Sequence, residues 1–147
     1  MPFSRAVAST PHIRECFQNG LTALGGDSSK IRVLQTRACN GSVNLDACLA
    51  TRYPSDNRWD YCFDYHGEVY FVEVHPAQTS EVNTVINKLE WLKNWLQNHA
   101  PEIDRMKAGN PFYWVQTGGF NILKTSPQYR RAREAGLLPI ARLELKH

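Results

Sequence analysis

Two runs of aromatic and β-branched residues, which meet at His66-Gly67, constrain the fold of this chain more than any other feature. The first run covers residues 59–65 and the second covers residues 68–74. Runs rich in Tyr, Phe and Val on both sides of a two-residue turn signal are typical of a β-hairpin. The sequence therefore predicts two adjacent antiparallel strands with His66 and Gly67 at the tip.

A two-residue turn also determines which residues face each other across the hairpin, because partners step away from the tip in equal numbers. Three cross-strand pairs follow from this register: Tyr65 with Glu68, Cys62 with Phe71, and Asp60 with Glu73. Residues directly opposite each other in an antiparallel pair have neighbouring side chains. The carboxylates of Asp60 and Glu73 are thus expected to be close together.

The alternation of side chains along a strand divides this hairpin into two faces. One face is apolar or aromatic and suits a core: Tyr61, Phe63, Tyr65, Tyr70, Val72 and Val74. The other face carries polar and apolar residues together: Asp60, Cys62, Asp64, Val69, Phe71, Glu73 and His75. The second face is too apolar to be fully exposed, so we expect its acids to be half buried. Such acids need a partner, either a metal ion or a cation such as Arg58, Lys88 or protonated His75.

The remaining patterns predict helices and strands on both sides of the hairpin. Helices are expected at residues 11–24, 79–98 and 127–136, with a weaker helical pattern at 42–52. Strands are expected at residues 31–36, 112–117 and 138–145, and Pro76 is expected to end the second hairpin strand. This order predicts a single mixed α/β domain over residues 1–147, with a central mixed sheet flanked by helices.

Composition and charge exclude several classes of protein. The chain lacks an apolar run as long as a signal peptide or a membrane span requires, so a cytoplasmic protein without a membrane segment is expected. The four cysteines, Cys16, Cys39, Cys48 and Cys62, form no CxxC pair, and we expect them to be reduced and mostly buried. A net charge of +3 is compatible with a polyanionic partner but falls short of a strongly basic binding domain.

The expected pairing of Asp60 with Glu73 indicates a chemistry. Two adjacent carboxylates raise each other's pKa unless a positive charge lies between them. Mg²⁺ is bound by one or two carboxylates, and water and substrate phosphate oxygens complete its octahedron. A metal ion bound there could activate water and neutralise charge on a phosphodiester, which indicates phosphodiester hydrolysis.

Asp60, the triplet Glu73-Val74-His75 and the long helix that leads to another strand resemble the PD-(D/E)XK nuclease-like superfamily. In that family the Asp opens one hairpin strand and the (D/E)XK motif lies on the next, inside a restriction-endonuclease-like αβββαβ core. The resemblance covers roughly residues 11–118. It implies Mg²⁺- or Mn²⁺-dependent cleavage of DNA or RNA, with Asp60 and Glu73 as metal ligands.

This chain departs from the family motif at two positions. Trp59 stands where the motif has Pro, and His75 stands where it has Lys, so the triplet reads ExH in place of ExK. A neutral imidazole lacks the fixed positive charge of a lysine. Either His75 acts as a third metal ligand or general base, or Lys88 on the following helix supplies the charge. The site then comprises Asp60, Glu73, His75 and Lys88.

Three other interpretations remain open for the same residues. The fold could be a non-catalytic module that binds nucleic acid or a protein partner, in which His75 marks the loss of the catalytic Lys. The acids could belong to a purely structural salt bridge. A hydrolase that uses His75 with a cysteine nucleophile has little support, since no Cys-His motif is present.

Further polar residues are assigned weaker or structural roles. Asp46 is expected to flank a short helix, Asp64 to lie toward the hairpin tip and Glu15 to be solvated. Gln116 could line the same cleft from its strand. The basic residues of the last helix are expected to form a solvated face: Lys124, Arg130, Arg131 and Arg133. The tryptophans Trp91, Trp95 and Trp114 are expected in the core rather than as base-stacking platforms.

Overall fold

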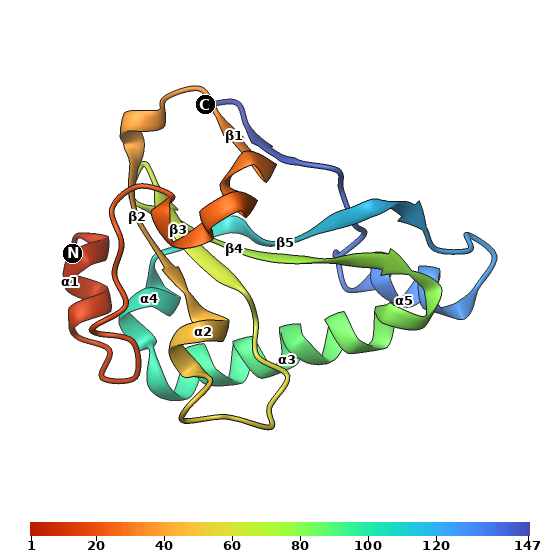
Figure 1. Cartoon of the computed structure of the whole chain (residues 1–147), viewed down its shortest axis with the longest axis horizontal. Coiled ribbons are helices and arrows are strands. Elements are labelled where there is room, and N and C mark those ends of the chain that lie inside the picture. Colours follow the sequence, from red (N-terminus) through yellow and green to blue (C-terminus); the bar gives the residue numbers. More distant parts are fainter.

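The computed structural model describes all residues, 1–147, and shows a mixed four-stranded sheet flanked by helices (Figure 1). The strands of the sheet are β2 (Cys39–Asn44), β3 (Tyr61–Tyr65), β4 (Glu68–Gln78) and β5 (Lys107–Asn121), in that spatial order. β2 and β4 each pair antiparallel with β3, whereas β5 pairs parallel with β4. The predicted mixed α/β class is confirmed.

The other elements surround this sheet. The α-helices are α1 (Phe3–Ala8), α2 (Leu45–Leu49), α3 (Val82–His99), α4 (Pro101–Arg105) and α5 (Pro127–Glu134). The 3₁₀ helices are η1 (Thr22–Lys30), η2 (Thr36–Ala38) and η3 (Thr79–Glu81). β1 (Ile31–Val33) and β6 (Leu143–Leu145) form a separate parallel pair. None of the helices has the length and apolar character that crossing a membrane requires.

The hairpin of β3 and β4 has the predicted register. Tyr65 pairs with Glu68 and Cys62 pairs with Phe71. His66 and Gly67 both have positive φ, 55° and 84°, as a tight two-residue hairpin turn requires. β3 begins at Tyr61, so Asp60 lies just before the strand. It still forms hydrogen bonds with Glu73 and Val74 of β4.

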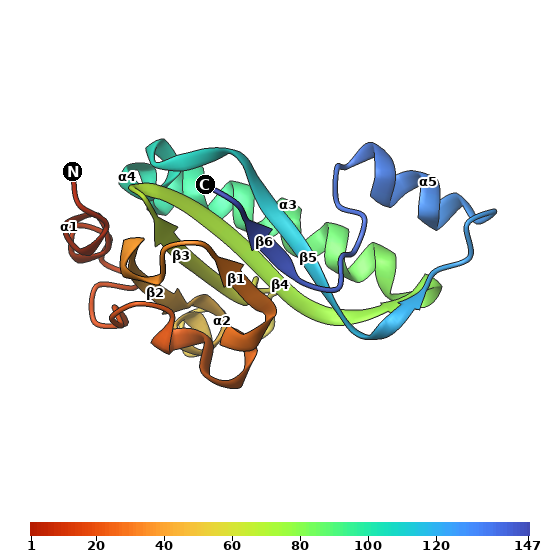
Figure 2. The same cartoon turned by 90° about the horizontal axis from the view of Figure 1, so that it is seen from above.

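The sheet is covered on both faces, which explains why both hairpin faces carry apolar residues. Figure 1 shows α3 below the sheet, and β1 with the C-terminal segment above it; Figure 2 shows α3 running along β4 and β5. The face toward α3 contributes Cys62, Val69 and Phe71 to one core, together with Val85, Leu89 and Leu92 of the helix. The opposite face contributes Phe63, Tyr65, Tyr70 and Val72 to a second core, together with Ile31 and Leu143 of the small sheet.

The two later helices match their predictions. The turn of η3 and the helix α3 together cover the segment predicted at 79–98, with Val82, Val85, Leu89, Leu92 and Leu96 buried. Ser126 caps α5, because its hydroxyl accepts a hydrogen bond of 3.1 Å from the Tyr129 amide. β5 is much longer than the predicted strand at 112–117.

The prediction of a helix at 11–24 is wrong. The Thr10 hydroxyl donates to the Ala6 carbonyl at 2.8 Å, so Thr10 closes α1 instead of opening a new helix. The chain then follows irregular turns, and Gln18 forms an isolated bridge with Ser42 of β2. The apolar residues of this segment reach the core because the chain folds back on itself, and not because they share one face of a helix.

β2 was not predicted, because Asn40-Gly41 has the composition of a turn. The two residues instead lie inside the strand, where the pairing register with β3 shifts between Cys39 and Gly41. A Cβ atom at Gly41 would lie 2.2 Å from Cε2 of Phe17, so only glycine lets the N-terminal segment approach here.

Three strand and helix boundaries also differ from prediction. The final strand is limited to β6, with an isolated bridge between Ile140 and Val115 before it, and the helical pattern at 42–52 is limited to α2. Pro76 does not end β4, which continues to Gln78. Beyond Val72, β4 pairs with β5 alone, and the register shifts between Pro76 and Ala77, which accommodates a residue without an N–H.

A disulfide joins Cys16 to Cys48, whereas Cys39 and Cys62 are buried free thiols. The prediction that all four cysteines are reduced is therefore wrong for Cys16 and Cys48. The segment after α1 folds back against α2 and brings the two Cα atoms to 6.2 Å, a closeness that a sequence separation of 32 does not reveal. A structural disulfide is more typical of an oxidising compartment, so the cytoplasmic location stays a prediction.

Candidate functional site

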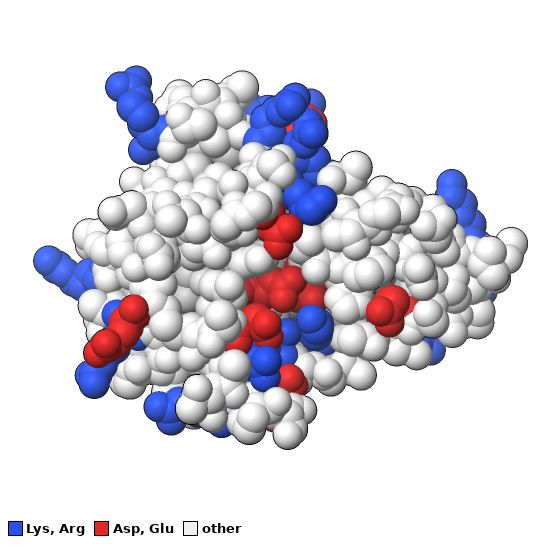
Figure 3. All heavy atoms as spheres, viewed as in Figure 1, with Lys and Arg blue, Asp and Glu red and all other residues white.

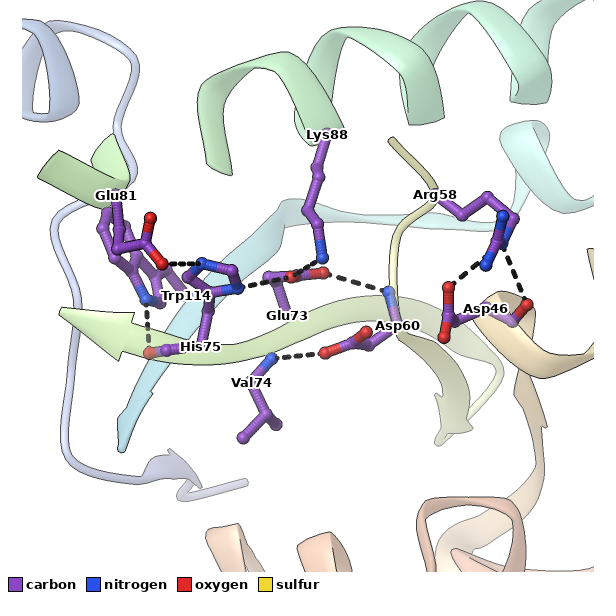
Figure 4. Close-up of polar contacts among 9 residues, drawn as sticks. All are labelled: Asp46, Arg58, Asp60, Glu73, Val74, His75, Glu81, Lys88 and Trp114. Carbon is purple, nitrogen blue, oxygen red and sulfur yellow. Dashed lines mark hydrogen bonds and ion pairs between the residues drawn. The ribbon is translucent and has the colours of Figure 1, made fainter. Parts of the chain in front are cut away.

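The structure brings together the side chains that the sequence singled out. Figure 4 shows Glu73 and His75 on β4, Asp60 just before β3, and Lys88 reaching down from α3. The local structure explains why these side chains lie close together. Glu73 and His75 alternate with Val74 on one strand and so share the face toward α3, while the turn at η3 returns the chain over this face.

Glu73 lies at the centre of this group. The side chain is fully buried, and each carboxylate oxygen has partners. Oε2 lies 2.5 Å from Nζ of Lys88 and 3.4 Å from Nδ1 of His75, and Oε1 accepts a hydrogen bond of 3.1 Å from the Asp60 amide. A buried carboxylate is costly unless it is paired and hydrogen-bonded, and Glu73 meets both conditions.

Asp60 is held by backbone groups from two neighbouring elements. Its Oδ2 accepts a hydrogen bond of 3.0 Å from the Val74 amide. Its carbonyl oxygen accepts from the amides of Leu45 and Asp46, at 2.8 and 3.2 Å, which are the first residues of α2. The start of α2 therefore fixes the backbone of Asp60 beside β4.

The pKa of Asp60 is raised from 3.8 to about 7. Burial is the main cause, and the charge of Glu73 adds to it, whereas the hydrogen bond from Val74 and the charge of Lys88 act in the opposite direction. Asp60 is therefore protonated in a large share of the molecules near neutral pH. The two nearby cations, Lys88 and His75, contact Glu73 and not Asp60.

His75 bridges two acids. Its Nδ1 faces Glu73, and its Nε2 lies 3.2 Å from Oε1 of Glu81. The hydrogen bond with Glu73 raises the pKa of His75; burial and Lys88 oppose this effect, and Glu81 adds to it. The His75 carbonyl also accepts a hydrogen bond of 3.0 Å from the Trp114 indole on β5. These contacts favour an imidazolium ring in a fixed orientation.

Sequence reasoning did not identify Glu81 as part of this site. Glu81 ends η3, just before α3 begins, and the chain must turn back over β4 before its carboxylate can reach His75. An acid at the start of a helix is common because of the helix dipole, so the sequence offered no reason to connect it with His75. The expected start of the helix near Thr79 was the only sequence feature that indicated where the chain turns back toward β4.

Asp60 and Glu73 carry the type of donor atom that a divalent metal ion such as Mg²⁺ binds. Both offer carboxylate oxygens, which Mg²⁺ prefers. Burial raises the pKa of Asp60 most, and the part of the rise that comes from the charge of Glu73 is a repulsion that a bound cation would relieve. No group of three or more His, Cys, Asp or Glu side chains is arranged to hold a metal ion. Two carboxylates with water as the remaining ligands are sufficient for Mg²⁺. His75 suits a third ligand less well, because both of its ring nitrogens face acids.

Arg58 and Asp46 form an ion pair next to the site. The Arg58 Nε lies 3.0 Å from Oδ1 of Asp46, and its guanidinium donates to the Tyr53 carbonyl at 2.6 Å. Arg58, considered above as a partner for the hairpin acids, is thus engaged by Asp46. Gln116 lies opposite His75 in the β4–β5 register and so borders the same strand segment.

Two other acids lie away from this group. Asp64 is buried near the hairpin tip, where its Oδ1 accepts from the Asn40 side chain and the Gly67 amide. Glu15 is exposed beside Cys16, in the folded-back N-terminal segment. Both positions agree with the structural roles expected for them.

The surface reflects this arrangement. Figure 3 shows acidic side chains gathered in a hollow near the middle of the face, with basic side chains at its margins. Acidic side chains in a hollow favour positive charge there, and the basic side chains at its margins favour negative charge. No protein-family model matches the chain, and neither a curated protein nor a solved structure matches it.

Proposed function

We propose that this chain is a divalent-metal-dependent nuclease of the PD-(D/E)XK-like type, in which Asp60 and Glu73 hold Mg²⁺ or Mn²⁺. The contact of 2.5 Å between Lys88 and Glu73 carries this proposal. It brings an ammonium group from α3 to the acid of the motif, which supports Lys88 in the role of the motif lysine, whose position is occupied by His75 here. In this proposal the positive charge comes from Lys88 on α3, whereas the lysine of the family motif lies on the strand that carries the acid.

The order of elements also supports the proposal. β2, β3 and β4 are followed by α3 and then by β5, which pairs parallel with β4. The resemblance implies an αβββαβ core, and these elements follow the βββαβ part of it, with the short α2 between β2 and β3 and without the helix expected at 11–24. It also implies an Asp at the start of one hairpin strand and the acid on the next, which is where Asp60 and Glu73 lie.

Each side chain has a role in this proposal. A divalent cation held by the two acids would lower the pKa of an attacking water and neutralise charge on the phosphodiester. Lys88 supplies a fixed positive charge for the phosphate. Asp60, with a pKa near neutrality in the metal-free protein, can give up its proton when a cation binds. His75 holds Glu73 and Glu81 in place.

Cleavage assays with single-stranded DNA, duplex DNA and RNA test the proposal. We expect purified protein to cleave at least one of them with Mg²⁺ or Mn²⁺ and to stop when EDTA is added. Asp60→Asn and Glu73→Gln should each lower the rate by at least about 100-fold. Glu68→Gln is the matched control, since Glu68 is an exposed acid on the same strand, away from the site.

Equal cleavage by the wild type and by the two acid variants would identify a contaminating nuclease and contradict the proposal. The absence of cleavage with every substrate and both metals would contradict it as well. Circular dichroism of each variant shows whether lost activity reflects lost folding.

The second candidate function is a non-catalytic nuclease-fold module that binds nucleic acid or a protein partner. The bridge from Glu73 through His75 to Glu81 favours it, because this bridge and Lys88 balance the buried acid without a metal ion. NMR titration of His75 with and without Mg²⁺ separates the two functions. A raised His75 pKa that Mg²⁺ leaves unchanged favours the binding module, and a metal-induced shift favours the nuclease.

A further inference from the structure

A cavity of about 250 Å³ lies beside the C-terminal half of α3, apart from the acids. Aromatic and polar side chains share its lining: Tyr53, Trp91, Asn94, Trp95, Asn98 and His99. We call this cavity the aromatic pocket. Trp95 and Trp114 are buried as expected from the sequence, whereas Trp91 is only half buried and faces this pocket. Trp91 packs against the core but is only half buried, so the expectation of a core position is confirmed for Trp91 only in part.

The rings of the aromatic pocket are held in fixed orientations. Trp91 and Trp95 lie parallel, with 6° between their planes and 6.2 Å between centroids, and Tyr53 meets Trp91 edge to face. The Trp91 indole N–H donates to Oδ2 of Asp56 at 2.9 Å, and the Trp95 indole N–H donates to Nδ1 of His12 at 3.2 Å. Because both polar edges are occupied and Trp95 is buried, the exposed part of the Trp91 ring is the surface left for a ligand.

The rim of the aromatic pocket offers unused hydrogen-bonding groups. Asn94 and Asn98 lie one turn apart on α3, so their side chains share one side of the helix. Both are exposed, and neither amide makes a hydrogen bond within the chain. A side-chain amide offers donors and an acceptor together. A flat ring with a mixed donor and acceptor edge matches this combination of a stacking face and a polar rim.

The aromatic pocket is adjacent to the candidate nuclease site. Trp91 follows Lys88 on α3 by about 4.5 Å along the helix axis. Arg58 connects the two places, since it donates to the Tyr53 carbonyl and pairs with Asp46, whose amide donates to the Asp60 carbonyl. The aromatic pocket and the candidate nuclease site are thus neighbours, as binding of one nucleic-acid strand at both places requires.

We propose that the aromatic pocket binds an unpaired nucleobase of the strand whose phosphate lies at Asp60 and Glu73. The assignment of that phosphate rests on the proposed nuclease function, whereas binding of the base does not require cleavage. A base within a duplex is stacked on its neighbours and cannot lie against Trp91. The preferred substrate class is therefore single-stranded nucleic acid, or a strand with unpaired bases.

Binding measurements in EDTA test this proposal without cleavage. We expect a short single-stranded oligonucleotide to quench the tryptophan fluorescence and to bind at least about tenfold more tightly than the duplex of the same sequence. Trp91→Ala should weaken single-strand binding at least about fivefold, because stacking on one aromatic ring contributes roughly 1–3 kcal/mol per base. Trp91→Phe should keep most of the affinity.

Two further variants sharpen the measurement. Replacing both Asn94 and Asn98 by Ala should reduce differences in affinity among single-stranded homopolymers, because the amides contact the base edge while Trp91 contacts its face. Phe120→Ala is the matched control for Trp91→Ala, since Phe120 is an exposed aromatic residue on β5 outside the aromatic pocket. It should bind like the wild type.

Photo-cross-linking keeps the test decisive if Trp91→Ala fails to fold. An oligonucleotide with 5-bromouracil, irradiated on the wild-type protein, should attach to Tyr53 or Trp91. Attachment elsewhere, equal binding of single strand and duplex, or no oligonucleotide binding overturns the proposal. Metal-dependent cleavage with unchanged binding by Trp91→Ala would refute the aromatic pocket alone. Trp91-dependent binding without cleavage would refute the nuclease alone.

Discussion

At the scale of single residues, the site is short of positive charge. Three acids, Asp60, Glu73 and Glu81, face two cations, Lys88 and His75. Both cations contact Glu73 and neither contacts Asp60, and burial together with the charge of Glu73 raises the pKa of Asp60 to about 7. The protonation of Asp60 therefore changes with pH near neutrality.

The pKa of Asp60 predicts how stability depends on pH. An acid whose pKa is higher in the folded state holds a proton there between its unfolded and folded values, so stability falls as the pH rises from about 4 to about 7. The raised pKa of His75 acts in the same direction, because its stabilisation is complete below pH 6.5 and is lost as the pH passes the folded value.

Asp60→Asn should remove the first of these two effects. We expect metal-free wild-type protein to lose about 3 kcal/mol more stability than Asp60→Asn between pH 4.5 and pH 7.5. Urea denaturation at the two pH values measures the difference. Identical pH profiles for the two proteins would show that Asp60 has an ordinary pKa.

Lys88 is expected to contribute to stability as well as to function. Lys88→Met leaves the fully buried Glu73 without its closest cation and should destabilise the fold by about 3 kcal/mol. The double variant with Glu73→Gln should be destabilised by clearly less than the sum of the single effects. Lys93→Met, on the exposed side of α3, should cost less than about 1 kcal/mol. Additive effects of Lys88→Met and Glu73→Gln would mean that the two side chains do not interact.

The sequence identified the central residues of the site but not all of its contacts. Asp60, Glu73 and His75 follow from hairpin register and alternation, which are local rules. Lys88 was one of several cations that could pair with half-buried acids, and the family pattern gave it a role because the motif lysine is missing. The contact of Glu81 with His75 and the aromatic pocket both depend on how α3 and the loop after α2 pack against the sheet. No local sequence pattern contains that information.

At the scale of elements, the Cys16–Cys48 disulfide anchors α2, whose first amides bind the Asp60 carbonyl. Closing a loop of 32 residues should stabilise the fold by roughly 3–4 kcal/mol. We expect reduction to lower the midpoint of urea denaturation, and the variant with Ser at both positions should match the reduced wild type. Reductant should leave the variant unchanged, and an unchanged wild type would contradict a stabilising disulfide.

Elements with a strong period were predictable, and those made by distant contacts were not. The hairpin and α3 satisfy a period of two and a helical period over their whole length. β2 is irregular in sequence, and its strand conformation depends on pairing with β3 and on the approach of Phe17 to Gly41. Residues 11–24 show helical spacing, yet the hydrogen bond of Thr10 and the bridge of Gln18 with Ser42 lead the chain elsewhere.

At the scale of the whole molecule, metal binding should be linked to folding. A ligand that binds only the folded state stabilises it by about 2.7 kcal/mol at a concentration 100 times its dissociation constant. We expect Mn²⁺ to raise the thermal midpoint, and to raise it more at pH 8 than at pH 6, because Asp60 must release its proton. Thermal scans with Mn²⁺ measure this, and Glu73→Gln should abolish the response. A rise equal at both pH values would contradict a site that includes Asp60.

The compact sequence span of the site has a consequence for how the molecule folds. Asp60, Glu73, His75, Glu81 and Lys88 all belong to one stretch in which the hairpin of β3 and β4 is followed directly by η3 and α3. Contacts that are close in sequence close small loops and form early, whereas the parallel pairing of β4 with β5 must await a long crossover. The hairpin and α3 can therefore assemble the acid cluster before the ends of the chain have docked. Pulse-labelling hydrogen exchange during refolding would then find β3, β4 and α3 protected ahead of β1 and β6.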